Sequence, residues 1–214
     1  MSDFPAELAG TSTRWNRRKL ARPAEILDAA LKVFAEKGYA GARMEDIAKR
    51  AGVTKGTIYL YFDGKEAVFK TLVRDSIGAT LGHVTDSARA FQGSAKDLIR
   101  FALTAMGQLL TTSDRVVLPK IIIAESGNFP ELARFYRDEI IEKGMSLLTG
   151  FLERGIESGE FRRLPIQHAA RLCVAPVLLG AIWRVTFARF DETPYDYQGL
   201  IDTHLDVLFK GLAP

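Results

Sequence analysis

Apolar residues recur at helical spacing along almost the whole chain. In residues 23–37, Ile26, Ala30, Val33 and Phe34 fall three or four positions apart, which places them on one face of a helix. Similar patterns occupy residues 44–51, 54–61 and 63–91. Beyond Gly93 no segment alternates with the period of two that is typical of a β-strand. The pattern therefore predicts an all-α protein of about nine helices.

Residues 44–69, MEDIAKRAGVTKGTIYLYFDGKEAVF, contain two short helical patterns joined by a tight turn. Gly52 gives this turn its backbone freedom, and Thr54 is a favourable N-cap for the helix that follows. A short helix, a turn with glycine and a second helix that can enter a DNA groove make up the helix-turn-helix motif. The segment therefore predicts a DNA-binding unit.

The second helix of this motif has one apolar anchor, Ile58, and a polar outer face. The residues expected to face outward are Lys55, Gly56, Thr57, Tyr59 and Tyr61. Hydroxyl groups, an ammonium group and a glycine that admits close backbone approach suit contacts with phosphates and base edges. The alternative is that part of this face, such as one tyrosine ring, packs on a neighbouring helix.

The next helix opens with DGKE, in which Asp63 and Glu66 are expected to form a capping box. Lys65 then lies in the first turn of a helix, where a phosphate group can bind. Apolar residues continue at helical spacing to about Phe91. This long helix is expected to join the DNA-binding unit to the rest of the chain.

The residues beyond Gly93 predict a helical bundle. Residues 172–187 are apolar on nearly every side, so a helix there must be covered by its own domain on one face and by something else on the other. The last helix, residues 196–211, has one apolar stripe. Two such helices can pair with their symmetry mates in a dimer. The candidate dimer residues are Ala175, Leu179, Ile201, Leu205 and Leu208.

Positive charge is concentrated in the part of the chain that contains the motif. Residues 11–65 hold 12 Lys and Arg against 6 Asp and Glu, whereas residues 66–214 hold 17 against 18. This asymmetry is expected where phosphates are bound, although a solvated basic face gives the same balance. Residues 1–22 are interpreted as a basic N-terminal arm that either follows DNA or remains a disordered tail.

Several classes of function lack the residues that they need. The three histidines are far apart and show no ligand spacing, so no metal site is expected. There is no glycine-rich phosphate loop and no nucleophile elbow, and we expect no enzymatic activity and no cofactor. The single cysteine, Cys173, fits a reducing compartment, and the apolar run 172–183 is too short to span a membrane. A cytoplasmic protein is therefore expected.

The segments AEILDAALKVFAEKGY, MEDIAKRAGVTKGTIYLYF and DGKEAVF resemble the DNA-binding domain of TetR-family transcriptional regulators over residues 23–70. The resemblance implies that residues 54–62 form the recognition helix, that Lys65 contacts the DNA backbone, and that a dimer binds palindromic operators. Arg43 departs from the family, which usually has Ser or Thr there to cap the first helix of the motif; an arginine cannot accept that bond and can instead contact a phosphate. The candidate DNA contacts are Arg43, Thr54, Lys55, Gly56, Thr57, Tyr59, Tyr61 and Lys65.

The segment IIIAESGNFPELARFYRDEI resembles the C-terminal domain of the AefR-like subgroup. This resemblance implies an effector cavity among the central helices and a dimer built on the last two long helices. The apolar candidates for the cavity lining are Phe101, Met106, Ile122, Phe135, Phe151, Trp183 and Phe187. Ordinary core packing is the alternative for each of them.

The expected protein is a homodimeric, ligand-responsive regulator with three parts: a basic arm (1–22), a three-helix DNA-binding domain (23–70), and a ligand-binding and dimerisation domain (71–214). We expect a repressor that binds a palindromic double-stranded DNA operator and is released by a small, largely apolar effector. Two alternatives remain open at this point. The second domain can dock a protein partner instead of an effector, or the protein can activate transcription.

Overall fold

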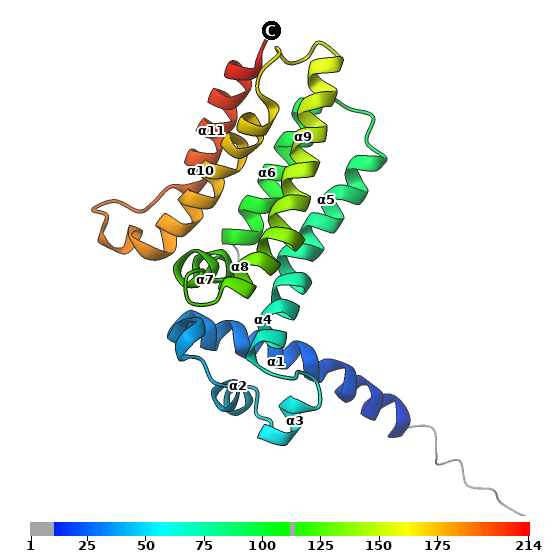
Figure 1. The fold of residues 1–214 in the computed structure, drawn as a ribbon, viewed down its shortest axis with the longest axis vertical. Coiled ribbons are helices and arrows are strands. Elements are labelled where there is room, and N and C mark those ends of the chain that lie inside the picture. Colours follow the sequence, from blue (N-terminus) through cyan, green and yellow to red (C-terminus); the bar gives the residue numbers. More distant parts are fainter. Residues whose placement is uncertain (1–10, 112–113) are drawn as a thin grey trace, which may run out of the picture. The chain divides into compact units, whose positions relative to one another are not determined.

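The structure is a computed structural model that describes residues 11–111 and 114–214, with side chains described from Pro23 onward. All regular elements in these ranges are helices (Figure 1), which confirms the all-α prediction. The chain divides into two compact units between Leu72 and Val73, and each is described by itself.

The first unit contains α1 (Thr11–Gly41), α2 (Met44–Arg50), α3 (Lys55–Tyr59) and nearly all of α4 (Lys65–Val73). The second unit follows with η1 (Arg74–Gly78), α5 (Ala79–Arg89), α6 (Ala95–Thr111), η2 (Asp114–Val116), α7 (Val117–Glu125), α8 (Pro130–Tyr136), η3 (Arg137–Ile141), α9 (Glu142–Glu157), α10 (Ile166–Thr186), η4 (Ala188–Phe190) and α11 (Tyr197–Leu212). The π-helical turns η1 and η3 join α4 to α5 and α8 to α9 without a break. The described residues therefore form nine continuous α-helical segments.

Helix α1 differs from the sequence prediction at its start. It begins at Thr11, and Pro23, which was expected to open it, lies inside. Proline removes one backbone donor from the helix ladder, yet the helix continues through it. The basic residues of the expected arm from Thr11 onward therefore belong to a helical backbone, and residues 1–10 lie outside the described residues. The helical conformation is interrupted at Gly38, whose φ of 68° favours glycine.

Three aromatic rings form the centre of the first unit. Phe34 near the end of α1, Tyr39 just after Gly38, and Phe69 in α4 are all buried. The Phe34 and Phe69 ring centroids lie 5.6 Å apart, and those of Tyr39 and Phe69 lie 5.4 Å apart, both in edge-to-face geometry. This cluster fixes the end of α1 against α4.

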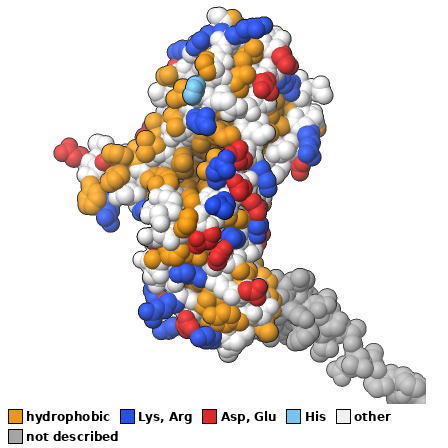
Figure 2. Space-filling model, in the orientation of Figure 1, with side chains coloured by type: hydrophobic (Ala, Val, Ile, Leu, Met, Phe, Trp, Pro, Cys, Tyr) orange, Lys and Arg blue, Asp and Glu red, His pale blue; other side chains and the backbone are white. Residues whose placement is uncertain are grey.

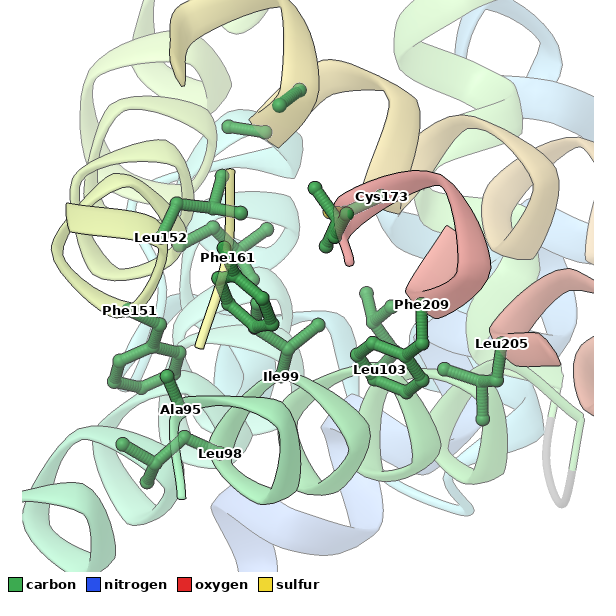
Figure 3. Packing of buried hydrophobic residues seen from close by; sticks show 14 of the residues in the cluster. Ala95, Leu98, Ile99, Leu103, Phe151, Leu152, Phe161, Cys173, Leu205 and Phe209 are labelled. Atoms are coloured by element: carbon green, nitrogen blue, oxygen red, sulfur yellow. The ribbon is translucent and has the colours of Figure 1, made fainter. Parts of the chain in front are cut away.

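The core of the second unit is formed by α6, α9, α10 and α11, which pack against one another. Figure 3 shows Leu103 of α6, Phe151 and Leu152 of α9, and Phe209 of α11 converging in this core. Cys173 of α10 is fully buried there, and burial raises the pKa of its thiol to about 11. The cysteine is therefore a packing residue.

Two glycines allow close contacts within this core. A Cβ at Gly155 of α9 would overlap the ring of Phe161, and a Cβ at Gly180 of α10 would overlap Leu200. At Gly180 this close approach is made by α11 of the same chain.

We expect Gly155→Ala to lower the free energy of unfolding by about 1–3 kcal/mol, because the new methyl group meets the Phe161 ring in a filled core. Gly144→Ala in the same helix is the control, since a Cβ there has nothing within 4 Å. Gly144→Ala should therefore raise the free energy of unfolding by about 0.5–1 kcal/mol, because it removes a glycine from the interior of a helix. Urea unfolding followed by circular dichroism measures both changes. Similar effects of the two substitutions would contradict the packing around Phe161.

Candidate nucleic-acid interface and ligand groove

The turn between α2 and α3 has the geometry of a helix-turn-helix. Gly52 adopts a φ of 66°, a conformation that L side chains rarely adopt. Thr54 is the N-cap of α3, and its hydroxyl oxygen accepts a hydrogen bond from the Thr57 amide at 3.1 Å. Ile58 is fully buried and anchors this five-residue helix to the first unit. The turn, the cap and the anchor together present the opposite face of α3 outward.

The structure places the predicted contact residues of this segment together on one surface. Thr54, Lys55, Gly56 and Tyr59 are exposed. Thr57 and Tyr61 are half-buried, so both remain partly accessible. Helix α3 ends at Tyr59 rather than Tyr61, and the backbone turns onward through bonds to the Ile58 carbonyl.

Leu60 belongs to the same surface and was missed by sequence reasoning. Its side chain is 81% exposed. The signal was present in the sequence, because two residues after the buried Ile58 a helical side chain points to the opposite face. The hydroxyl and ammonium groups that predicted the contact residues of this surface do not indicate Leu60, whose side chain is apolar.

Lys55 is paired within the motif. Its ammonium group lies 2.5 Å from a carboxylate oxygen of Glu45 in α2. The hydrogen bond lowers the pKa of the Glu45 carboxyl and raises the pKa of Lys55. Both side chains remain more than half exposed, so the pair can open when a phosphate approaches.

Arg43 occupies the N-cap position of α2 and makes no side-chain capping bond, as expected for a group that has only donors. Its side chain is exposed. The arginine is thus placed at the start of α2, where it can contact a phosphate.

Lys65 has an additional role that the sequence did not reveal. Its ammonium group donates hydrogen bonds to the carbonyl oxygens of Tyr39 at 2.6 Å and Ala40 at 3.3 Å. The same group lies 4.5 Å from the centre of the Tyr39 ring. Lys65 therefore ties the first turn of α4 to the residues that follow Gly38.

The positive charge of this part of the chain is unevenly distributed. Residues 11–22 carry five of the 12 Lys and Arg between positions 11 and 65 and none of the 6 Asp and Glu. The remaining charges of the first unit are almost balanced, and several of them pair, as Lys37 does with Asp46 at 2.8 Å and Arg50 with Glu36 at 2.7 Å. The excess charge that favours phosphate binding thus lies mainly in the basic residues of α1.

A groove of about 1030 Å³ runs between α5 and α9 in the second unit. Its apolar residues are Leu81, Leu98, Ile140, Leu147 and Phe151. Its charged residues are Arg74, Asp86, Arg89, Glu139, Glu142, Lys143 and Arg154. An apolar lining with charged groups around it suits an amphipathic ligand.

Glycines keep this groove open. Gly82 of α5 and Gly150 of α9 line it, and a Cβ at either position would meet nothing within 4 Å. A third lining glycine, Gly78, belongs to the π turn η1. The groove therefore exists because side chains are missing at these positions on facing helices.

The two π turns meet at one end of the groove. Arg74 of η1 forms a bidentate pair with Glu139 of η3 and lies 4.9 Å from the centre of the Phe135 ring. At the other end Arg154 donates to the carbonyl oxygens of Phe91 and Gly93. Single π turns inside α-helices often occur at functional sites, which agrees with their position here.

The predicted cavity residues are scattered. Phe151 lines the groove. Ile122 is buried elsewhere in the unit, Phe135 is buried beside Arg74 at one end of the groove, and Met106 packs beside the core. Three of the aromatic candidates are exposed: Phe101, Trp183 and Phe187. Large apolar side chains in the sequence do not predict this groove, because its lining depends on glycines and charged residues.

An exposed apolar stripe on α10 stands out among the predicted dimer residues. Ala175 is exposed and Leu179 is 64% exposed, and Leu172, one helical turn before Ala175, is 64% exposed as well. Val207 of α11 adds another exposed apolar side chain. Figure 2 shows further hydrophobic side chains at the end of α10, on the left of the view.

The α11 part of the dimer prediction needs correction. Ile201 and Leu205 are buried in the chain's own core, and Leu208 packs against that core. This stripe faces α6 and α10 of the same chain, so Ile201 and Leu205 are not available to a partner subunit, whereas Leu208 remains partly exposed.

The sequence matches two family models of bacterial regulators. The model described as bacterial regulatory proteins, tetR family, matches residues 26–72, and the model described as AefR-like transcriptional repressor, C-terminal domain, matches residues 96–203. The second match alone covers half of the chain. The chain belongs to the TetR family of transcriptional regulators. It is a helix-turn-helix DNA-binding protein of a non-enzymatic family, which confirms that part of the sequence prediction.

Relatives of this TetR-family chain include the fatty acid metabolism regulator protein of Bacillus subtilis, which is 27% identical over 198 residues and covers 92% of this chain and 98% of its own length. An HTH-type regulator of the same organism, YdeS, is 32% identical over 157 residues, covering 71% of this chain and 74% of its own. The crystal structure of B. subtilis FadR in complex with stearoyl-CoA has a TM-score of 0.74 and 27% identity, and covers 88% of this chain and 98% of that one. FadR of Bacillus halodurans has a TM-score of 0.72 and 25% identity, with coverages of 88% and 94%.

We expect Lys65→Met to lower the free energy of unfolding by about 1–3 kcal/mol, because two carbonyl groups lose a charged donor. Lys70→Met is the matched control in the same helix. It removes a pair with Glu66 four residues earlier, which is worth about 0.3–0.5 kcal/mol. Urea unfolding measures both variants. An equally small effect of Lys65→Met would show that these bonds do not hold α4 to α1.

Proposed function

We propose that this TetR-family protein is a cytoplasmic repressor that binds a palindromic operator as a homodimer and is released by a long-chain acyl thioester of coenzyme A. The observation that carries the DNA-binding part is the outer surface of α3 and its flanks, where a capped short helix presents hydroxyl groups, a cation and a glycine. Such groups suit phosphate and base-edge contacts. The proposed contacts are Arg43, Thr54, Lys55, Gly56, Thr57, Tyr59, Tyr61 and Lys65.

The dimer proposal is supported by the apolar stripe on α10. By length and composition the 21-residue α10 could cross a membrane, which the shorter run 172–183 did not indicate, and 33% of its most apolar window is buried within the chain. The helix also packs on α6, α9 and α11, as a core helix of a globular domain does. A second copy that pairs with Leu172, Ala175 and Leu179 would cover the remaining apolar surface, and a twofold dimer is the commonest assembly. Such a dimer presents two α3 helices to two half-sites, as palindromic operators require.

The effector proposal is supported by the groove and by the relatives. The groove combines an apolar lining with a small excess of positive charge, four Lys and Arg against three Asp and Glu, so it suits a ligand with a long apolar part and an anionic part. Its residues on α5 extend from Leu81 to Arg89, and the rise of a helix makes the stretch from Gly78 to Arg89 about 16 Å long. Acyl-CoA has both parts, and the related B. subtilis FadR is crystallised with stearoyl-CoA.

The backbone offers a route from the groove to the DNA-binding unit. One helical run passes from Lys65 through η1 to Arg89, and η1 contributes Arg74 and Gly78 to the groove. A ligand that favours another arrangement of η1 shifts the population of states by its differential affinity for them. In this proposal, the Arg74–Glu139 pair is the contact that the ligand disturbs.

The operator and dimer proposals are tested together with Leu179→Asp. Wild-type protein should prefer an operator selected from random DNA by about a thousandfold or more over random sequence, measured by fluorescence anisotropy. A carboxylate placed in an apolar interface should weaken the dimer by about a hundredfold or more, measured by analytical ultracentrifugation, and operator binding should weaken with it. Ile123→Asp on α7 is the control, because Ile123 is similarly exposed at 61%. A Leu179→Asp protein that remains dimeric would contradict the proposed interface.

The effector proposal is tested by filling the groove. Stearoyl-CoA should weaken operator binding of the wild-type protein by about 5- to 150-fold, whereas free CoA should have little effect. Gly150→Leu should abolish the response, because the new side chain occupies the groove without meeting other atoms at its Cβ. Gly144→Leu adds the same side chain to the same helix at a position outside the lining residues, and it should respond like wild type. Equal responses of the two variants would exclude the groove as the effector site.

A further inference from the structure

Leu60 is highly exposed, whereas most large apolar side chains of the first unit are buried. Among described residues 23–72, the large hydrophobic side chains classed as exposed are Leu60 at 81% and its neighbour Tyr59 at 44%. Both lie at the end of α3. A single exposed leucine is common on protein surfaces, but here the exposure coincides with the DNA-reading surface.

The folded unit gains little from the Leu60 side chain. The residue is the C-cap of α3, and its backbone N–H bonds to the Thr57 carbonyl at 3.2 Å. Any residue type with a backbone N–H can make that bond. The anchor of α3 is the buried Ile58, whose side chain points to the opposite face. Folding therefore does not explain the apolar side chain at position 60, and contact with a molecule that binds this surface can explain it.

We propose that Leu60 packs against the 5-methyl group of a thymine in the major groove and so specifies a T·A pair at one position of each operator half-site. The thymine methyl is the apolar group that base edges present in that groove, and apolar side chains are its usual contact. Leucine can neither donate to nor accept from the other base edges. This inference rests on the operator binding proposed above and adds a specificity-determining residue to it.

The same contact disfavours cytosine. Cytosine carries only a hydrogen at C5, where thymine carries the methyl group, so Leu60 loses its packing contact there. Leu60 thus selects by packing, while Thr57 and Tyr59 beside it carry hydroxyl groups for polar contacts.

Deoxyuridine provides the test, because it differs from thymidine only by this methyl group. Each thymine of the selected operator is replaced in turn, and the affinity of the full-length protein is measured by anisotropy. At one position, replacement in one half-site should weaken wild-type binding about fourfold, and replacement in both about fifteenfold. With Leu60→Ala, thymine and uracil at that position should bind almost equally. The high exposure of Leu60 means that this substitution leaves the core intact.

Tyr59→Phe is the control for position. It removes the neighbouring hydroxyl group, so it can change affinity while it keeps the preference for thymine over uracil. The inference is overturned if the wild-type protein prefers thymine over uracil at no position, or if Leu60→Ala keeps that preference. In either case the proposed operator binding is unaffected. If the wild-type protein prefers no selected sequence over random DNA, operator binding fails and this inference fails with it.

Discussion

The packing of the Phe34, Tyr39 and Phe69 rings is the interaction on which the DNA-binding unit depends. Helix α3 has five residues and cannot be stable alone, because a helix of that length does not offset the cost of its nucleation. Its orientation comes from Ile58 and from the helices that the ring cluster fixes in place. The Lys65 bonds to the residues after Gly38 reinforce the same junction. The surface proposed to read DNA is thus determined by a small core beneath it.

Much of this unit was predictable because its signals are local. The 3.6-residue period marked the helices, Gly52 marked the turn, and Thr54 was correctly expected to cap α3. Two predictions made from neighbouring residues were wrong, because in each case the same residues can adopt more than one arrangement. Helix α1 continues through Pro23, and Glu66 pairs with Lys70 instead of returning to Asp63.

The second unit was less predictable because its signals depend on tertiary partners. The period of α11 identified its apolar stripe but not that the stripe faces the chain's own core at Leu205. Helix α10 is apolar on nearly all sides, so its period did not separate the face in the core from the exposed face, although Leu179, named as a dimer candidate, is exposed. The groove could not be predicted from the sequence either, because the glycines that line it lie on two helices that are far apart in the sequence.

The glycines of the groove also set a balance between stability and access. Each glycine inside a helix costs roughly 0.5–1 kcal/mol relative to alanine, and at Gly82 and Gly150 no close packing demands this residue type. The lack of a side chain at these two positions leaves room between α5 and α9 for the proposed ligand. A larger residue there would raise the free energy of unfolding and at the same time fill part of the proposed ligand groove. Selection for higher stability would therefore tend to reduce the size of the ligands that this groove can admit.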